Sequence, residues 1–243
     1  MSELLENLTR IRSRIDQACE RSGRQPDSVR LMAVSKNQSP ERVAEAASAG
    51  LTLFGENRIQ EAKMKIAQCP NRLEWHFIGH LQSNKSRDAV SLFHVVQGVD
   101  SLSLAEELQK QAIKQARSLP ILLEVNVAGE SSKFGWNPDR LLTELLQLNG
   151  LPQLAVHGLM TIAPYAVDPE QVRLVFRRLR ELRDRCADLL GAPLPVLSMG
   201  MSGDLDVAIE EGATLVRVGT ALFGERPHRT DANNPPGASD SVG

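Results

Sequence analysis

The sequence predicts a single (β/α)8 barrel with an additional N-terminal helix. Apolar segments of strand length alternate with amphipathic helical segments about eight times over about 220 residues, which is the pattern of this architecture. The chain of 243 residues has the length of one such barrel. No change in composition divides it into two domains. An open, doubly wound sheet is the alternative arrangement of the same elements.

Eight segments have the continuous apolar character of buried parallel strands. They are residues 28–36, 51–57, 74–80, 94–99, 120–127, 153–162, 195–201 and 214–219.

Helical segments lie between these strands. Apolar residues at helical spacing predict a helix over the first twenty or so residues, and the longest helix carries its apolar stripe between Val172 and Leu189. Ser39 followed by Pro40 is typical of a helix start, and Ser103 with Glu106 forms a capping-box pattern.

Composition excludes several classes of protein. A net charge of −2 gives no reason to expect binding to nucleic acid or to an anionic membrane. The three cysteines are widely spaced, which favours neither a disulfide framework nor a metal site. The charged N-terminus does not resemble a signal peptide, and no segment has the length and apolar character of a membrane span. We therefore expect a cytoplasmic protein with one domain over residues 1–224 and a disordered tail over residues 225–243.

Lys36 ends the first strand and is a candidate amine for a Schiff base. The alternative is an ordinary solvent-exposed lysine at the end of a strand. Barrel closure places the eighth strand beside the first, so Arg217 becomes a neighbour of Lys36. Two valines flank Arg217 and suit the helix layer, which predicts that Arg217 points into the barrel. It then either pairs with a core carboxylate, Glu124 or Glu56, or faces a ligand.

The loops after the seventh and eighth strands resemble a phosphate site. They read SMGMSGD (198–204) and VGTALFG (218–224), and they offer Ser198, Ser202, Gly219 and Thr220. Such barrels commonly bind phosphate with these two loops, and we expect Ser202 to cap the following helix. A phosphate site beside a lysine and an arginine suggests pyridoxal 5′-phosphate. An arginine facing the ring nitrogen would disfavour its protonation.

Seven motifs also resemble those of the YggS/PROSC family of pyridoxal phosphate homeostasis proteins. In order, they are AVSK (33–36), FGEN (54–57), FIGHLQSNK (77–85), GESSKFG (129–135), HGLMTI (157–162), LSMGMSGD (197–204) and RVGTALFG (217–224).

The resemblance implies a fold type III barrel like the N-terminal domain of alanine racemase, with the cofactor bound as an imine on Lys36. It assigns the phosphate to Ser202, Gly219 and Thr220, with help from Ser198. Arg217 would face the ring nitrogen, and Asn57 and Met160 would line the cofactor. It further implies buffering or delivery of the cofactor, which would influence amino-acid and keto-acid pools, with PLP-dependent apoenzymes as possible recipients and no established turnover.

Other functions remain as alternatives. Racemisation needs a second base, which alanine racemase takes from a further domain; the only tyrosine here, Tyr165, is expected at the surface. A class-I aldolase using Lys36, or an interaction protein in which the cofactor is a signal, would fit the same lysine. Lys85 and Lys133 are rival amines in loops. His76 and His80 flank a strand end, so no metal site is expected. We expect a monomer.

Overall fold

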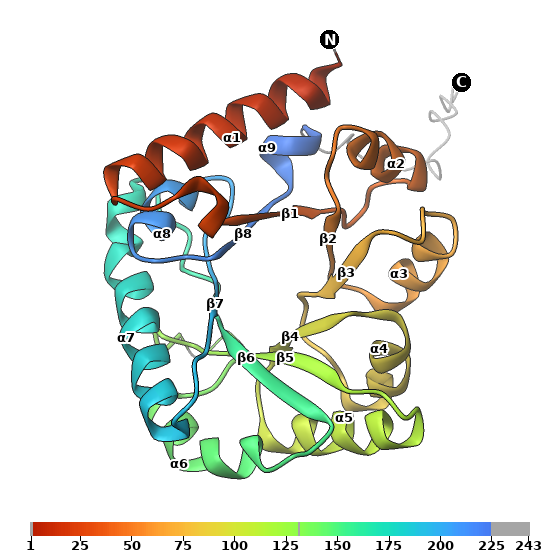
Figure 1. Ribbon diagram of the computed structural model, residues 1–243, viewed down its shortest axis with the longest axis vertical. Coiled ribbons are helices and arrows are strands. Elements are labelled where there is room, and N and C mark those ends of the chain that lie inside the picture. The colour runs from red at the N-terminus through yellow and green to blue at the C-terminus, as the bar shows by residue number, and fades with distance from the viewer. Residues whose placement is uncertain (1, 131, 225–243) are drawn as a thin grey trace, which may run out of the picture.

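The computed structural model describes residues 2–130 and 132–224 and shows a closed parallel barrel (Figure 1). The strands follow one another around the barrel in sequence order, and β1 closes the ring against β8. Their bounds are β1 Arg30–Val34, β2 Leu53–Glu56, β3 Glu74–Phe77, β4 Val95–Val99, β5 Leu119–Glu124, β6 Leu154–Met160, β7 Val196–Ser198 and β8 Leu215–Val218. All eight predicted strands are therefore confirmed, and the open sheet is excluded.

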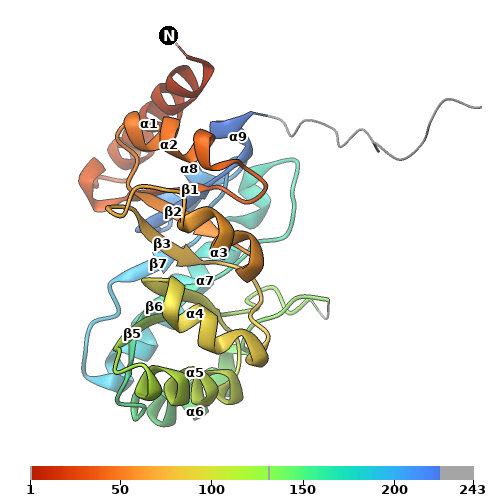
Figure 2. The ribbon, with the colours of Figure 1, turned by 90° about the vertical axis from the view of Figure 1, so that its right-hand side faces the viewer.

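Helices surround the barrel on its outside (Figures 1 and 2). The α-helices are α1 Glu3–Arg21, α2 Pro40–Ser48, α3 Ile59–Ile66, α4 Ser86–Leu92, α5 Leu102–Lys114, α6 Pro138–Asn149, α7 Arg173–Leu190, α8 Leu205–Glu210 and α9 Thr220–Phe223. Short 3-10 turns are η1 Pro26–Ser28, η2 Ser83–Lys85 and η3 Pro169–Val172. None of the helices in the described ranges is long and apolar enough to cross a membrane.

Two apolar layers hold the barrel. Alternate strand residues pack outward against the helices in the main core, which includes Ala33, Phe54, Val216 and Val218. A smaller cluster of Met32, Leu53 and Leu215 fills the inside of the barrel. The division follows from the two-residue period of strand side chains.

Helix α1 is not a free appendage, because its apolar stripe packs against α8 and α9 (Figure 1). The Asn7 amide donates to the Leu222 carbonyl at 3.1 Å, which joins the beginning of the chain to the last helix. The inner face of α1 is already buried.

Of the two predicted helix caps at Ser39 and Ser103, the structure shows the first. Ser39 does cap α2, since its hydroxyl accepts a hydrogen bond from the Arg42 N–H at 3.4 Å. The prediction of a capping box at Ser103 was wrong. Helix α5 begins two residues earlier than that box implies, and its cap is Ser101, whose hydroxyl accepts a hydrogen bond from the Leu104 N–H. The expected disordered tail, residues 225–243, lies outside the described residues.

Candidate functional site

Lys36 lies just after β1, at the carboxyl end of the barrel, and its side chain is partly buried. The residue after it, Asn37, has a φ of 62°, a left-handed conformation that asparagine tolerates better than most residues. The chain therefore turns sharply at Lys36 before α2 begins. The (β/α)8 fold places catalytic and binding groups at this end of its strands.

Helix α3 fixes the backbone on both sides of Lys36. The buried ammonium of Lys65 donates to the Ser35 carbonyl at 2.6 Å, and Glu61 accepts from the Asn37 N–H at 2.6 Å. Lys65 also forms ion pairs with Glu56 and Glu61, at 2.6 and 2.8 Å. The turn that carries Lys36 is thus held by a charged cluster beneath it.

Glu56 takes part in this cluster and not in the barrel interior. It accepts from the Ser35 hydroxyl at 2.7 Å as well as from Lys65. Burial raises the pKa of Glu56, while the hydrogen bond from Lys65 opposes that rise. The possibility that Glu56 pairs with Arg217 is therefore excluded.

Arg217 points into the barrel, as the alternation along β8 predicted. Its side chain is buried and donates to the Ser198 hydroxyl at 2.7 Å and to the Thr161 carbonyl at 2.8 Å. Burial lowers the pKa of Arg217 to about 10, and the nearby carboxylates Glu124 and Asp204 oppose this shift. Both of these hydrogen-bond partners are uncharged, so this buried cation is well suited to an anionic or electron-rich ligand.

Glu124 ends β5 and is buried near Arg217. Burial and the charge of Asp100 raise the pKa of Glu124 to about 7, although Arg217 acts in the opposite direction. The two residues interact through space, and among the described residues no ion pair within 4.0 Å joins them. Glu124 is therefore a weak counterion for Arg217.

The two predicted phosphate loops lie next to each other. The Ser202 hydroxyl accepts from the Ala221 N–H at 3.3 Å, which connects the loop after β7 to the first turn of α9. Gly219 lies against Val34, because a Cβ at this position would be 3.4 Å from the Val34 Cβ and carbonyl oxygen. The expectation that Ser202 caps α8 was wrong, since α8 begins after Asp204 and has no side-chain cap.

Arg14 of α1 holds the loop that carries Ser202. Its guanidinium donates to the Ser202 carbonyl at 2.9 Å and forms an ion pair with Asp206. An arginine from the first helix therefore supports a loop near the end of the chain. Nothing in the sequence pattern distinguished Arg14 from the other surface arginines of that helix.

Asn57 and Met160 lie at the same end of the barrel. Met160 ends β6 beside Ser198 of β7, and its neighbour Leu159 belongs to the outer core, so Met160 faces inward. Asn57 follows β2, and its backbone packs against Gly79, where a Cβ would be only 2.6 Å from the Asn57 oxygen. Asn57 also lines a cavity of about 540 Å³ together with Lys85.

The rival lysines and the two histidines have other contacts. Lys133 pairs with Glu130 at 2.6 Å, and Lys85 ends a 3-10 turn after β3. His80 is a loop residue as expected: it contacts Asp100 at 3.0 Å and stacks on Phe134 of the GESSKFG segment, with ring centroids 3.6 Å apart. His76 instead lies inside the barrel.

Sequence reasoning missed the hydrogen bonds that continue from Ser198, the partner of Arg217, to Gln97 and His76. The Ser198 hydroxyl donates to the Gln97 side-chain oxygen at 2.6 Å, and the Gln97 amide lies 2.8 Å from His76 Nδ1. Gln97 and His76 are both buried on strands. The only available signal was a polar side chain inside an apolar strand, which requires a hydrogen-bond partner.

Known proteins resemble this chain over most of its length. The family "Alanine racemase, N-terminal domain" matches residues 7–227. The pyridoxal phosphate homeostasis protein of Aquifex aeolicus is 46% identical, over 92% of this chain and 98% of its own length. That of Pseudomonas aeruginosa is 44% identical, over 96% and 100%.

Solved structures extend the similarity to three dimensions. PipY of Synechococcus elongatus, solved with PLP bound, has 40% identity and a TM-score of 0.81, covering 91% of this chain and 100% of PipY. Alanine racemase of Clostridium difficile shares the fold at 16% identity and a TM-score of 0.73, covering 94% of this chain and 58% of the racemase. The identities to the curated relatives, over nearly the whole of both chains, show that the chain belongs to the pyridoxal phosphate homeostasis protein family, within the wider alanine racemase N-terminal domain family.

Proposed function

We propose that this protein binds pyridoxal 5′-phosphate at the carboxyl end of its barrel and buffers or delivers it within the cytoplasm. The observation that carries the proposal is the buried Arg217, held by the hydroxyl of Ser198 on β7 and the carbonyl of Thr161 just after β6, beside the loops of Ser202 and Gly219. PipY, solved with PLP bound, is the relative that supports the choice of cofactor.

The residues present fit this cofactor. Lys36 supplies an amine at the mouth of the barrel, on a turn fixed by Lys65 and Glu61. Ser202, Gly219 and Thr220, with Ser198 nearby, would hold the phosphate, because a hydroxyl and backbone N–H groups at a turn suit an anion. Arg217 would face the ring nitrogen, and Asn57 and Met160 would line the ring. When bound, pyridoxal phosphate supplies an aldehyde that condenses with amines.

We further propose that the protein has no catalytic turnover. Removing a proton on one face and returning it on the other requires two bases, and the alanine racemase of C. difficile is matched over only 58% of its length. Tyr165 is 95% exposed, as expected of a surface residue, and offers no enclosed second base. A barrel mouth open to water would suit transfer of the cofactor better than stabilisation of a carbanion.

The organisation of the chain completes the proposal. Residues 1–224 act as one cofactor-binding unit, including α1, and the protein acts as a monomer. Its recipients are PLP-dependent apoenzymes, and it requires neither nucleic acid nor a membrane.

Borohydride reduction tests the cofactor assignment. The purified full chain is loaded with pyridoxal phosphate, reduced, digested and mapped by mass spectrometry. We expect the added mass on Lys36, its loss in Lys36→Ala, and its retention in Lys133→Ala and Lys85→Ala. Circular dichroism of Lys36→Ala checks that the barrel still folds. Covalent cofactor in Lys36→Ala, or its absence from the unsubstituted protein, would contradict the proposal.

A second measurement separates a carrier from an enzyme. Incubation of the loaded protein with L-alanine in deuterated water reports exchange of the α-hydrogen. We expect no sustained exchange, so multiple turnovers would establish a racemase. Trapping of a sugar phosphate on Lys36 by a colourless protein would establish an aldolase instead.

A further inference from the structure

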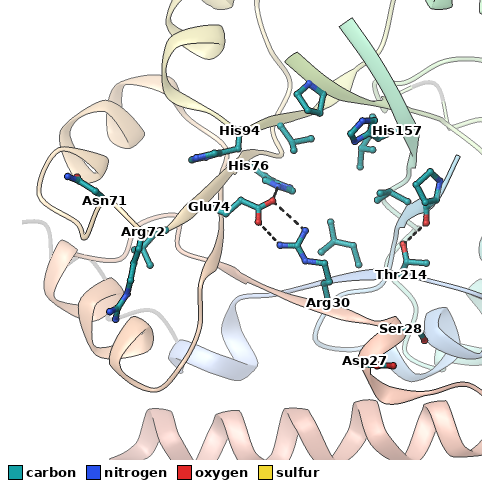
Figure 3. A pocket seen from close by; sticks show the side chains of 17 residues that line it. Asp27, Ser28, Arg30, Asn71, Arg72, Glu74, His76, His94, His157 and Thr214 are labelled. Atoms are coloured by element: carbon teal, nitrogen blue, oxygen red, sulfur yellow. Dashed lines mark hydrogen bonds and ion pairs between the residues drawn. The ribbon is translucent and has the colours of Figure 1, made fainter. Parts of the chain in front are cut away.

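A second cavity lies at the opposite end of the barrel from Lys36. It has a volume of about 740 Å³, within the range of small-molecule sites, and it opens among the first residues of the strands (Figure 3). Arg30, Glu74, Val196 and Leu215 each begin a strand and line it. The amino end of a (β/α)8 barrel ordinarily serves stability, so a cavity with polar groups here is unusual for the fold.

An ion pair forms the polar side of this cavity (Figure 3). Arg30 donates to the two carboxylate oxygens of Glu74 at 2.6 and 3.4 Å, and both side chains remain partly exposed, at 53% and 34%. Glu74 also lies 2.7 Å from His76 Nε2. The hydrogen bond from His76, together with Arg30, lowers the pKa of Glu74 to about 2, so this carboxylate is ionised at neutral pH.

Around the ion pair, the remaining hydrogen-bonding capacity consists mainly of donors, while Asp27, the other carboxylate of the lining, is exposed. The described contacts of Arg30 use two of its five N–H groups, whereas three hydrogen bonds already reach the Glu74 oxygens. His94 accepts from the Trp75 N–H through Nδ1, so its other ring nitrogen carries a proton. Donors in excess select a ligand with acceptor oxygens, and the guanidinium selects a carboxylate.

The other walls of the cavity are apolar. Leu73, Leu122, Val196 and Leu215 line it together with two prolines. His157 reaches it from β6 at an irregularity in the strand, because Ile121 pairs with Val156 while the next residue, Leu122, pairs with Gly158. Such an extra residue redirects a side chain, as often happens beside functional sites. The ligand should therefore have a short apolar body.

A chain of hydrogen bonds crosses the barrel from this cavity to Arg217. Arg217 donates to Ser198, Ser198 donates to Gln97, the Gln97 amide reaches His76 Nδ1, and His76 Nε2 reaches Glu74. The successive distances are 2.7, 2.6, 2.8 and 2.7 Å. With the His76 proton on Nε2, every bond has one donor and one acceptor, and all point from the buried cation to the carboxylate. Such aligned chains polarise one another.

We propose that the cavity at the amino end of the barrel is a second binding site, for a small organic carboxylate with an apolar body, and that this chain couples it to Arg217. A carboxylate on Arg30 competes with Glu74 for the guanidinium. Glu74 then interacts differently with His76, and the change passes through Gln97 and Ser198 to the cation at the other end. The coupling, but not the binding, rests on the proposed function, in which Arg217 faces the cofactor.

Binding is tested on the full chain without added cofactor. Isovalerate and its neutral amide, isovaleramide, have the same shape, so ligand-observed NMR separates charge from apolar contact. We expect isovalerate to bind with a Kd of about 1 mM or tighter and the amide not to bind. Arg30→Gln should weaken isovalerate binding by about tenfold or more. Arg72→Gln is the matched control, because Arg72 lines the rim but points away from the ion pair (Figure 3). Equal binding of the amide, unchanged binding to Arg30→Gln, or no binding of isovalerate would overturn the site.

Coupling is tested on the protein loaded with pyridoxal phosphate. Saturating isovalerate should shift the visible absorption of the bound cofactor, and Gln97→Met should abolish the shift while NMR still detects isovalerate. Isovalerate binding without a spectral shift, or a shift that persists in Gln97→Met, would overturn the coupling. A protein that carries no cofactor on Lys36 contradicts the proposed function and leaves the isovalerate result standing.

Discussion

The buried guanidinium of Arg217 donates a 2.7 Å hydrogen bond to the hydroxyl of Ser198 on the neighbouring strand. The same hydroxyl donates to Gln97, so Ser198 serves both as acceptor and as donor. Removing the Ser198 hydroxyl leaves the Arg217 guanidinium and the Gln97 side-chain oxygen, both buried, without this hydrogen-bond partner. Their desolvation is then no longer offset.

Ser198→Ala should therefore destabilise the protein by about 1–3 kcal/mol. Urea denaturation followed by circular dichroism measures the change. Ser48→Ala is the control, because Ser48 is an exposed helix hydroxyl bonded to the Ala44 carbonyl, and it should change stability by less than about 0.5 kcal/mol. Equal effects of the two substitutions would mean that the buried hydrogen bonds contribute little.

Arg14→Ala should weaken cofactor binding without preventing folding. Arg14 donates to the Ser202 carbonyl at 2.9 Å and so fixes a loop that we assign to the phosphate. Loss of this support should raise the Kd for pyridoxal phosphate by about threefold to tenfold, measured by absorbance titration. Arg12→Ala, an exposed arginine on the same helix, should leave the Kd unchanged. If both variants bind equally well, the loop does not depend on α1.

Lys65→Met should be strongly destabilising. The substitution leaves the buried carboxylate of Glu56 without its cationic partner, a loss of about 3–5 kcal/mol. Lys63→Met on the exposed side of the same helix is the control for helix propensity and charge. The double variant Lys65→Met, Glu56→Met should recover part of the loss in urea denaturation, because it no longer buries an unpaired charge. No recovery would show that packing, and not charge, dominates.

Glu124 should make stability depend on pH between about 4.5 and 7. Its pKa is about 7 in the folded protein and 4.5 in the free side chain. Between these values the folded state binds more protons than the unfolded state, so stability falls as pH rises and levels off above 7. The contribution is about 3–4 kcal/mol at most. Glu124→Gln should flatten this part of the stability profile in the cofactor-free protein; an unchanged slope would contradict the assignment.

Local patterns were sufficient for the elements and for the direction of Arg217. The alternation of Leu215, Val216, Arg217 and Val218 identified the inward face, because valines suit the helix layer. Strand order then followed from the regular alternation of elements. Lys36, Ser198 and Ser202 could be assigned to one end of the barrel, because each lies at or just after the carboxyl end of a predicted parallel strand.

Long-range polar contacts could not be predicted in the same way. Gln97 and Ser198 are 101 positions apart, and their contact depends on strand registers that include shifts between β4, β5 and β6. The predicted start of α5 was wrong for a local reason: Ser101 and Ser103 compete as caps, and the register of α5 selects Ser101. The Ser202 hydroxyl likewise accepts from the Ala221 N–H of α9, and not from α8, because the loops after β7 and β8 pack together.

The contact between Arg14 and Ser202 joins residues 188 positions apart. Together with the pairing of β1 to β8, it means that the proposed cofactor site cannot assemble until β8 has been synthesised. A nascent chain that ends before β8 already carries Lys36 but lacks Arg217, and its first strand has an unpaired edge. Cofactor capture should therefore report completed ring closure, which makes the bound chromophore an internal signal that the whole barrel has folded.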